Sequence, residues 1–279
     1  MAQKVYDNGD VRSRDLLLMG KMDLVLGITA GYLLFVWLGP RIMRQRPACE
    51  LRRLMLVYNV VMVVWSGWMF AELLINSQLA GYNYFCTPYS VSFAPTELRI
   101  VRALWAYYVS KAVEFLDTVF MVLKKKEKQL TFLHVYHHAV MFPLWYFVMM
   151  DGPCCQAVFS AMLNSFVHVV MYSYYALALF PALHPYLWWK RYLTQLQLVQ
   201  FLCVITATLT GLLTGCDYPF WLHVVNIAFL VSLVILFSRF YISAYIRRYR
   251  TPPASRPASA KIPLNKPEPP VLHLRPKAE

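Results

Sequence analysis

Three histidines, His134, His137 and His138, lie within TFLHVYHHAVMFPLWYFVMM, a stretch that is otherwise apolar enough to sit in a lipid bilayer. On a helix these positions are i, i+3 and i+4, so the three side chains share one face. A fourth histidine, His168, follows in NSFVHVVMYSYY. Imidazole can act as a nucleophile, as an acid or base near neutral pH, or as a metal ligand. Four intramembrane imidazoles are hard to explain by packing, so the sequence predicts a reaction site there.

Other polar side chains recur at helical spacing in three further apolar stretches, so that four stretches carry a polar stripe. Ionisable groups cost about 2.5–3.5 kcal/mol each in a bilayer on insertion scales, so we expect these side chains to face one another or a cavity. A structural explanation stays open for some of them, because charged stripes can join helices and tyrosines such as Tyr174 can be packing residues. The positions are Lys111, Glu114, Asp117, Thr118, Asn164, Tyr172, Tyr175, Thr194, Gln197 and Gln200.

The composition indicates the setting of these stripes. The chain has 279 residues, of which 59% are hydrophobic and only 15% charged, whereas soluble domains average about 25% charged residues. This predicts an all-α integral membrane protein. Apolar runs of about 17–25 residues predict seven transmembrane helices: 22–39, 55–75, 101–123, 132–150, 157–179, 194–213 and 221–245.

The distribution of Lys and Arg predicts the orientation, because cytosolic loops carry the excess of these residues. The loops near 76–98, 151–156 and 214–220 contain neither Lys nor Arg, so we expect them to face the lumen or exterior. The amino terminus is then lumenal and the carboxyl terminus cytosolic, although four amino-terminal cations oppose this placement. The net charge of +13 suits lipid head groups or an anionic substrate, and no nucleic-acid motif accompanies it.

Three segments follow from this pattern. Residues 1–21 form an amino-terminal lumenal segment, 22–250 the seven-span domain, and 251–279 a disordered cytosolic tail rich in proline and charge. Cysteines in the lumenal loops predict a disulfide between Cys86 and Cys216, in an oxidising compartment. The other lumenal pair is poorly suited to bridging itself, but either member could compete as a partner; these residues are Cys154 and Cys155.

Two functional classes compete on the residues alone. The HxxHH spacing is found in membrane di-iron desaturases and hydroxylases, but those enzymes need about eight histidines and this chain has 7. A seven-span receptor would fit the orientation. The third run, however, lacks a DRY-like end, the seventh lacks NPxxY, and a receptor has no use for HVYHH. Metal analysis and ligand-dependent coupling to a partner would test these alternatives.

The strings KAVEFLDT, HVYHH, HVVMYSYY, LWWKRYLT and TQLQLVQ resemble the very-long-chain fatty acid elongase family in order and spacing, from about residue 20 to 250. The resemblance implies six helices in an inverted barrel around a narrow acyl tunnel, with one peripheral span. It implies a 3-ketoacyl-CoA synthase of the endoplasmic reticulum that condenses acyl-CoA with malonyl-CoA. The reductases and dehydratase of the elongation cycle, and a second copy of the chain, are the implied protein partners. The RPKAE end resembles a retrieval signal, with Arg275 in place of the first Lys.

The resemblance also implies roles for individual residues. His137 would attack the acyl thioester, His134 and His138 would orient it or move protons, and His168 with Asn164 would hold the malonyl group. We expect no cofactor and no metal, because decarboxylation of malonyl-CoA supplies the carbanion equivalent and hydrogen-bond donors can stabilise the enolate. The predicted substrate contacts are Lys111, Glu114, Asp117, Lys124, Lys126, Gln129, Tyr172, Tyr174, Tyr175, Lys190, Arg191, Thr194, Gln197 and Gln200.

Overall fold

The computed structural model describes residues 9–153 and 155–247, which form eight α-helices and contain no β-strand. Short 3-10 turns interrupt two loops, η1 (Glu127–Gln129) and η2 (Pro181–Tyr186), and a π-helical segment, η3 (Ile242–Arg247), follows the last helix. The predicted disordered tail, 251–279, lies outside the described residues. The helices are α2 (Met22–Met43), α3 (Arg52–Leu79), α4 (Pro95–Val113), α5 (Phe115–Leu123), α6 (Phe132–Asp151), α7 (Cys155–Leu177), α8 (Lys190–Leu213) and α9 (Phe220–Tyr241).

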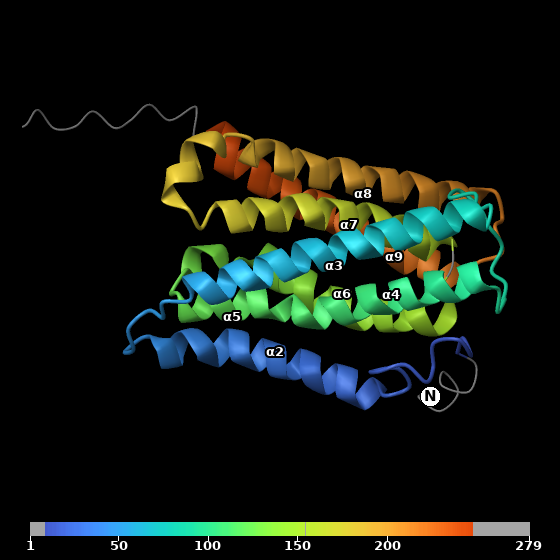
Figure 1. Cartoon of the computed structure of the whole chain (residues 1–279), viewed down its shortest axis with the longest axis horizontal. Coiled ribbons are helices and arrows are strands. Elements are labelled where there is room, and N and C mark those ends of the chain that lie inside the picture. Colours follow the sequence, from blue (N-terminus) through green and yellow to red (C-terminus); the bar gives the residue numbers. More distant parts are fainter. Residues whose placement is uncertain (1–8, 154, 248–279) are drawn as a thin grey trace, which may run out of the picture.

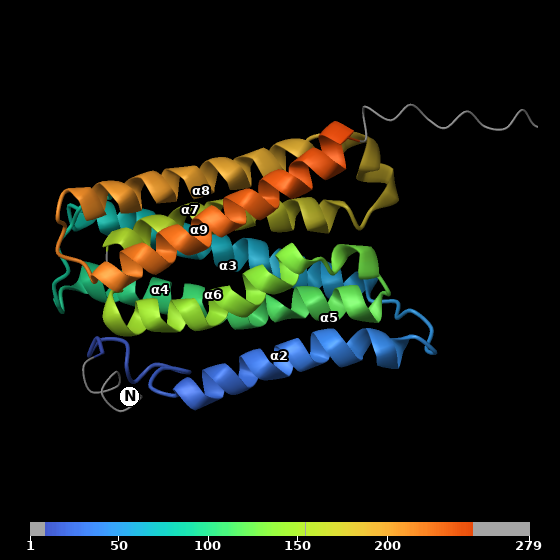
Figure 2. The same cartoon turned by 180° about the vertical axis from the view of Figure 1, so that it is seen from behind.

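The helices run side by side along the long axis of the molecule (Figures 1 and 2). The loops after α2, α5 and α7 gather at one end, where most of the loop lysines and arginines lie; we call this the basic end. The loops after α3 and α8 lie at the other end, which we call the disulfide end, and they contain no Lys or Arg. The bundle therefore has the charge asymmetry that the sequence predicts for a membrane protein.

Five of the described helices, α2, α3, α7, α8 and α9, are long and apolar enough to cross a membrane. The chain is thus an all-helical membrane protein. Helices α4 and α6, with 19 and 20 residues, are about 28–30 Å long and match the hydrocarbon thickness. They carry the charged stripe and the histidines, which lower their hydropathy. The count of seven crossings stays a prediction.

The helix neighbours follow a closed cycle. Helix α3 packs against α4 and α7, α7 against α8, α8 against α9, α9 against α6, and α6 against α4. Helix α2 packs on the outside against α5 and α6 (Figure 1). This order surrounds a central space with six helical units, and the inverted geometry of a barrel stays a prediction.

The predicted third span, 101–123, is divided into two helices that meet at Glu114. The amide of Glu114 still bonds to the Ser110 carbonyl at 2.8 Å, but the Asp117 amide makes a tighter three-residue bond to the Glu114 carbonyl at 3.1 Å. The tighter turn begins at Glu114 itself, whose buried carboxylate is bound by Lys111. Sequence patterns predicted one continuous run because apolar residues continue on both sides of Glu114.

The segment before α2 is fastened to the disulfide end. The Asp10 amide donates to the Met150 carbonyl at 2.7 Å, and the Ser13 hydroxyl donates to the Met149 carbonyl at 2.8 Å. Arg12 forms a fully buried ion pair with Asp10 at 2.6 Å. Burial alone would lower the pKa of the Arg12 guanidinium, but hydrogen bonds and the charge of Asp10 more than offset it, so the pKa is raised. The last turn of α6 is therefore held in place by residues from outside the spans.

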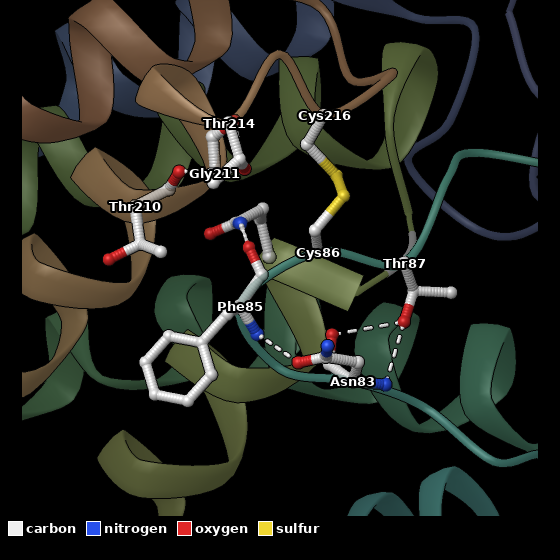
Figure 3. The surroundings of a disulfide bond; sticks show 9 residues. Asn83, Phe85, Cys86, Thr87, Thr210, Gly211, Thr214 and Cys216 are labelled. Carbon is white, nitrogen blue, oxygen red and sulfur yellow. Dashed lines mark hydrogen bonds between the residues drawn. A yellow bond between two sulfur atoms is a disulfide. The ribbon is translucent and has the colours of Figure 1, made fainter.

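The predicted disulfide between Cys86 and Cys216 is confirmed (Figure 3). Helix α8 ends at Leu213, and two residues later Gly215 has a φ of +68°, which suits a residue without a side chain. The following Cys216 amide bonds back to the Gly211 carbonyl at 2.9 Å. Gly81, with φ of +70°, turns the chain in the same way after α3. These two turns direct the loops toward each other. Of the competing cysteines, Cys154 lies outside the described residues.

Replacing both Cys86 and Cys216 by serine should destabilise the protein. The crosslink closes a loop of 130 residues, for which the chain-entropy model gives at most about 5 kcal/mol. We expect the free energy of unfolding to fall by about 2–4 kcal/mol, because insertion of the helices into the membrane already restricts the unfolded chain. Thermal unfolding of the detergent-solubilised protein measures the effect, with exposed Cys203→Ser as the control. An unchanged melting temperature, or free thiols at both positions in peptide mapping, would contradict the crosslink.

Candidate active site

A cavity of about 660 Å³ opens among the helices toward the basic end. Its lining combines cations near the loops with imidazoles and amides deeper in the bundle. The structure thereby brings most of the predicted site residues around one space. Those that line it are Glu114, Asp117, Lys124, Lys126, Gln129, His134, His137, His138, Asn164, His168, Tyr172, Tyr174, Tyr175, Lys190, Thr194, Gln197 and Gln200.

Two predicted contact residues do not line this cavity. Lys111 is buried behind its wall, 2% exposed, with its Nζ 4.1 Å above the ring centre of Tyr107. Arg191 is exposed and donates to the Tyr192 hydroxyl at 2.6 Å. Lys128 does line the cavity, although the sequence interpretation did not include it.

A turn after α5 positions the lysines at the mouth of the cavity. Lys125 has φ of +54°, and the amides of Lys125 and Lys126 bond back to the carbonyls of Val122 and Met121 at 3.0 and 2.8 Å. This is the glycine-type helix ending, here made by a lysine. The Lys125 ammonium donates to the Arg44 carbonyl at 3.2 Å, away from the cavity, whereas Lys124 and Lys126 both line it.

The three histidines of α6 have different surroundings. The Thr131 hydroxyl caps the helix by accepting from the His134 amide at 3.3 Å, which fixes where the histidine face begins. The His134 ring Nε2 lies 2.7 Å from the Thr118 hydroxyl, which in turn lies 3.1 Å from the Tyr32 hydroxyl. The His138 ring is 4.5 Å from that of His134 and 5.1 Å from that of His137.

Glu114 is the centre of a buried charge cluster. Its Oε1 accepts from the Lys111 ammonium at 2.7 Å and from the Ser110 hydroxyl at 3.2 Å, and lies 3.4 Å from His168 Nδ1. Lys111 and Glu114 are 2% and 1% exposed, so their charges compensate each other away from water. Asp117, one turn further, accepts from the Tyr172 hydroxyl at 2.8 Å.

Asn164 connects three helices at the centre of the bundle. Its Oδ1 accepts from the Tyr107 hydroxyl at 2.6 Å and from the Lys111 ammonium at 3.3 Å. Its Nδ2 donates to Gln200 Oε1 at 3.4 Å. Helices α4, α7 and α8 are thus joined through one amide, which is thereby held against the cavity.

A second, narrow cavity of about 40 Å³ continues from the first. The two share His137, Asn164, Gln200 and Phe201 in their linings, and of the α6 histidines only His137 lines both. Beyond this junction the narrow cavity is lined mostly by apolar side chains such as Met141, Trp145, Leu230 and Leu233. His137 therefore lies where a polar, cation-lined space meets an apolar channel.

Sequence reasoning missed several residues that shape this site. Tyr107 lies one turn before Lys111 on the same face of α4, so the helical spacing contained the signal. Gln156 and Ser160 extend the stripe of Asn164 and His168 on α7 at steps of four residues, and they too could have been found. Tyr32 belongs to an apolar helix outside the cycle, and nothing in its sequence pattern indicates its contact with Thr118.

Within residues 9–153 and 155–247, no group of three or more His, Cys, Asp and Glu side chains has the arrangement of a metal site. The expectation of a metal-free reaction stays a prediction, which metal analysis and chelation of the active protein would check.

The fold and the site define an integral membrane protein whose polar residues converge on one internal cavity. The profile of the ELO family, described as the GNS1/SUR4 family, matches residues 17–252. The chain is 48% identical to very long chain fatty acid elongase 2 of Mus musculus over 221 residues, 79% of this chain and 75% of the relative. Identity is 47% with elongase 4 of Homo sapiens, over 86% of this chain and 75% of the relative. It is 45% with elongase 5 of Xenopus tropicalis, over 86% of this chain and 81% of the relative. The chain belongs to the GNS1/SUR4 family.

Proposed function

We propose that this chain is a very-long-chain 3-oxoacyl-CoA synthase, which condenses a long-chain acyl-CoA with malonyl-CoA in the first step of fatty acid elongation. The observation that supports it best is the position of His137, between a cation-lined cavity and a narrow apolar one. A thioester that joins a phosphorylated carrier to a hydrocarbon chain has this same division of polarity. The names of the similar proteins support a role in fatty acid elongation.

The two cavities suit the two halves of an acyl-CoA. Lys124, Lys126, Lys128 and Lys190 line the wide cavity at the basic end, where ammonium groups can bind the phosphates of CoA. The acyl chain would extend past His137 along the narrow cavity, whose apolar side chains would move apart to admit it. Burial of methylene groups there is favourable by about 0.8 kcal/mol each.

In the first half-reaction, a ring nitrogen of neutral His137 attacks the thioester carbonyl carbon. The carbon–sulfur bond breaks, CoA leaves as a thiolate, and the proton from the other ring nitrogen neutralises it, so that acyl-imidazole and free CoA result. His138, whose ring adjoins that of His137, is placed to orient it. His134 is fixed by Thr118 and would support this arrangement from one turn away.

In the second half-reaction, malonyl-CoA loses CO2 and the resulting enolate carbon attacks the acyl carbon, which breaks the bond to His137. The products are 3-oxoacyl-CoA and a free imidazole that regains one proton from solvent. Asn164 and His168 line the cavity on the α7 side and would stabilise the enolate oxygen. Over both steps, acyl-CoA, malonyl-CoA and one proton give 3-oxoacyl-CoA, CO2 and CoA.

The proposed setting is the endoplasmic reticulum membrane. Seven crossings in an inverted barrel would place the basic end in the cytosol, where both substrates are made available, and the disulfide end in the oxidising lumen. The amino terminus is then lumenal and the carboxyl terminus cytosolic. The 3-oxo product requires reduction and dehydration, so the corresponding reductases and dehydratase are the proposed partners; a homodimer is a further proposal.

The direct test uses the purified full-length protein in lipid nanodiscs with acyl-CoA and labelled malonyl-CoA. We expect release of labelled CO2 when malonyl is labelled in its free carboxyl group, and a 3-oxoacyl-CoA two carbons longer than the primer. A desaturated or hydroxylated product of unchanged length would instead support the di-iron alternative.

Neutralising two cations at the cavity mouth should weaken substrate binding. For Lys124→Gln with Lys126→Gln we expect KM for acyl-CoA to rise about tenfold, or about 1.4 kcal/mol, with a smaller change in kcat. The dependence of KM on salt should also become shallower. Lys125→Gln is a matched control, because this lysine faces the Arg44 carbonyl instead of the cavity. Equal effects of the control and the double variant would show that the cations do not bind substrate.

A further inference from the structure

The narrow cavity has a polar far end. From Asn164 at the junction to Gln156 is eight residues along α7, or about 12 Å, and Gln200 to Thr208 on α8 covers the same length. Near this end the lining includes Thr208 and Asn226, which are hydrogen-bonded to each other at 3.0 Å. A hydrocarbon chain that reached this depth would meet polar groups after a mostly apolar path.

Among the polar residues at the far end of the narrow cavity, Gln156 is hydrogen-bonded to a loop of the disulfide end. Its side chain is 4% exposed, and its Nε2 donates to the Phe85 carbonyl at 3.1 Å. Phe85 directly precedes Cys86, and its own amide donates to the Asn83 side chain at 3.0 Å (Figure 3). The amide of Gln156 is therefore anchored to a loop that is itself held by the disulfide at Cys86 and by the hydrogen bond between Phe85 and Asn83.

Gly211 leaves the space that Gln156 occupies. A Cβ atom at position 211 would lie 2.5 Å from Gln156 Nε2 and 3.0 Å from the Phe85 carbonyl oxygen. The Gly211 carbonyl accepts from the Cys216 amide, so the disulfide holds this side of Gln156 as well as the Phe85 side. The position of Gln156 is thus determined from both sides by the crosslinked loops.

We infer that Gln156 is a specificity-determining residue, which limits how far an acyl chain extends beyond His137 and so sets the longest primer that the enzyme elongates. The inference rests on the proposed function, because it takes the narrow cavity as the acyl site. A chain ending before Gln156 is buried among apolar side chains. A longer chain must displace an amide from its hydrogen bond with Phe85, and a buried donor without a partner is unfavourable.

The test measures kcat/KM of the full-length protein for saturated acyl-CoA primers of increasing length. Gln156→Ala should raise kcat/KM for the first primer that the wild type rejects by about tenfold or more relative to kcat/KM for shorter primers. In Gly211→Ala the added Cβ takes the space of the Gln156 amide, so this amide has to move toward the cavity and the limit should shift to shorter primers. Gln195→Ala is the matched control, because this glutamine is exposed and bonds to the Tyr241 hydroxyl outside both linings.

A merely structural role would give a different result. If Gln156→Ala lowers kcat/KM by one common factor for every primer, or leaves the length limit unchanged, the inference is wrong. Thermal stabilisation by the same acyl-CoAs is measured in parallel and needs no catalysis. Absence of elongation in the wild type would contradict the proposed function, whereas the dependence of stabilisation on chain length would still test Gln156.

Discussion

A His137→Ala variant is expected to lose about 10³-fold or more of the condensation rate while folding and inserting normally. The reason lies in the division of roles on α6. His137 is the histidine of that helix that lines both cavities, whereas His134 is engaged with Thr118. Alanine at position 137 removes the proposed nucleophile and leaves the Thr131 cap of the helix in place.

One experiment distinguishes a nucleophilic role of His137 from a role as general base. The wild type is mixed with acyl-CoA alone, free CoA is measured, and the protein is digested to find an acyl mass on the peptide with His137. We expect CoA release without malonyl-CoA, and none from His137→Ala. His184→Ala is the control, because this histidine is exposed in the loop after α7 and bonds to the Ala178 carbonyl. Release that strictly requires malonyl-CoA would favour direct attack in a ternary complex, with His137 as a general base.

The second large effect is expected at the buried charge cluster. Lys111→Met keeps most of the side-chain volume but leaves Glu114 without its closest cation, and loss of one partner of a buried pair costs about 3–5 kcal/mol. The Asn164 side chain also loses one of its two donors, so activity should fall together with stability.

A double variant shows whether charge is the cause. Lys111→Met combined with Glu114→Gln removes both charges, and we expect it to recover about half or more of the lost stability, or roughly 2 kcal/mol. Unfolding in detergent, followed by near-ultraviolet circular dichroism, measures all variants. If the single variant is as stable as the wild type, or the double variant is less stable than either single variant, the pair does not stabilise the fold through compensation of charge.

Helical spacing predicted much of the site. The positions of the α6 histidines on one face, and of Asn164 and His168 on another, follow from 3.6 residues per turn, and the structure places all of them on one cavity. Spacing could not show which histidine reaches the narrow cavity. Nor could it show that His134 is engaged by Thr118 from α5, which contacts Tyr32 from α2, because these residues come together only through packing.

The charged stripe of α4 and α5 shows a second limit of sequence reasoning. A lysine within a membrane span is expected to be functional, and Lys111 was predicted to contact substrate. The structure places it behind the cavity wall, while Glu114 and Asp117 on the same stripe do line the cavity. Helical periodicity gives the face of a residue but not its depth in the wall, because the depth depends on neighbours such as Tyr107.

The turn after α5 matters for anyone who would redesign this protein. A left-handed backbone at a residue other than glycine costs about 1 kcal/mol, so a sequence optimised for this backbone alone would place glycine at position 125. Such a choice would remove the bond from Lys125 to the Arg44 carbonyl, which joins the turn to the end of the peripheral helix α2. The stability of the isolated turn and the attachment of this turn to α2 thus make opposite demands on one position, and a thermostabilised variant should leave it unchanged.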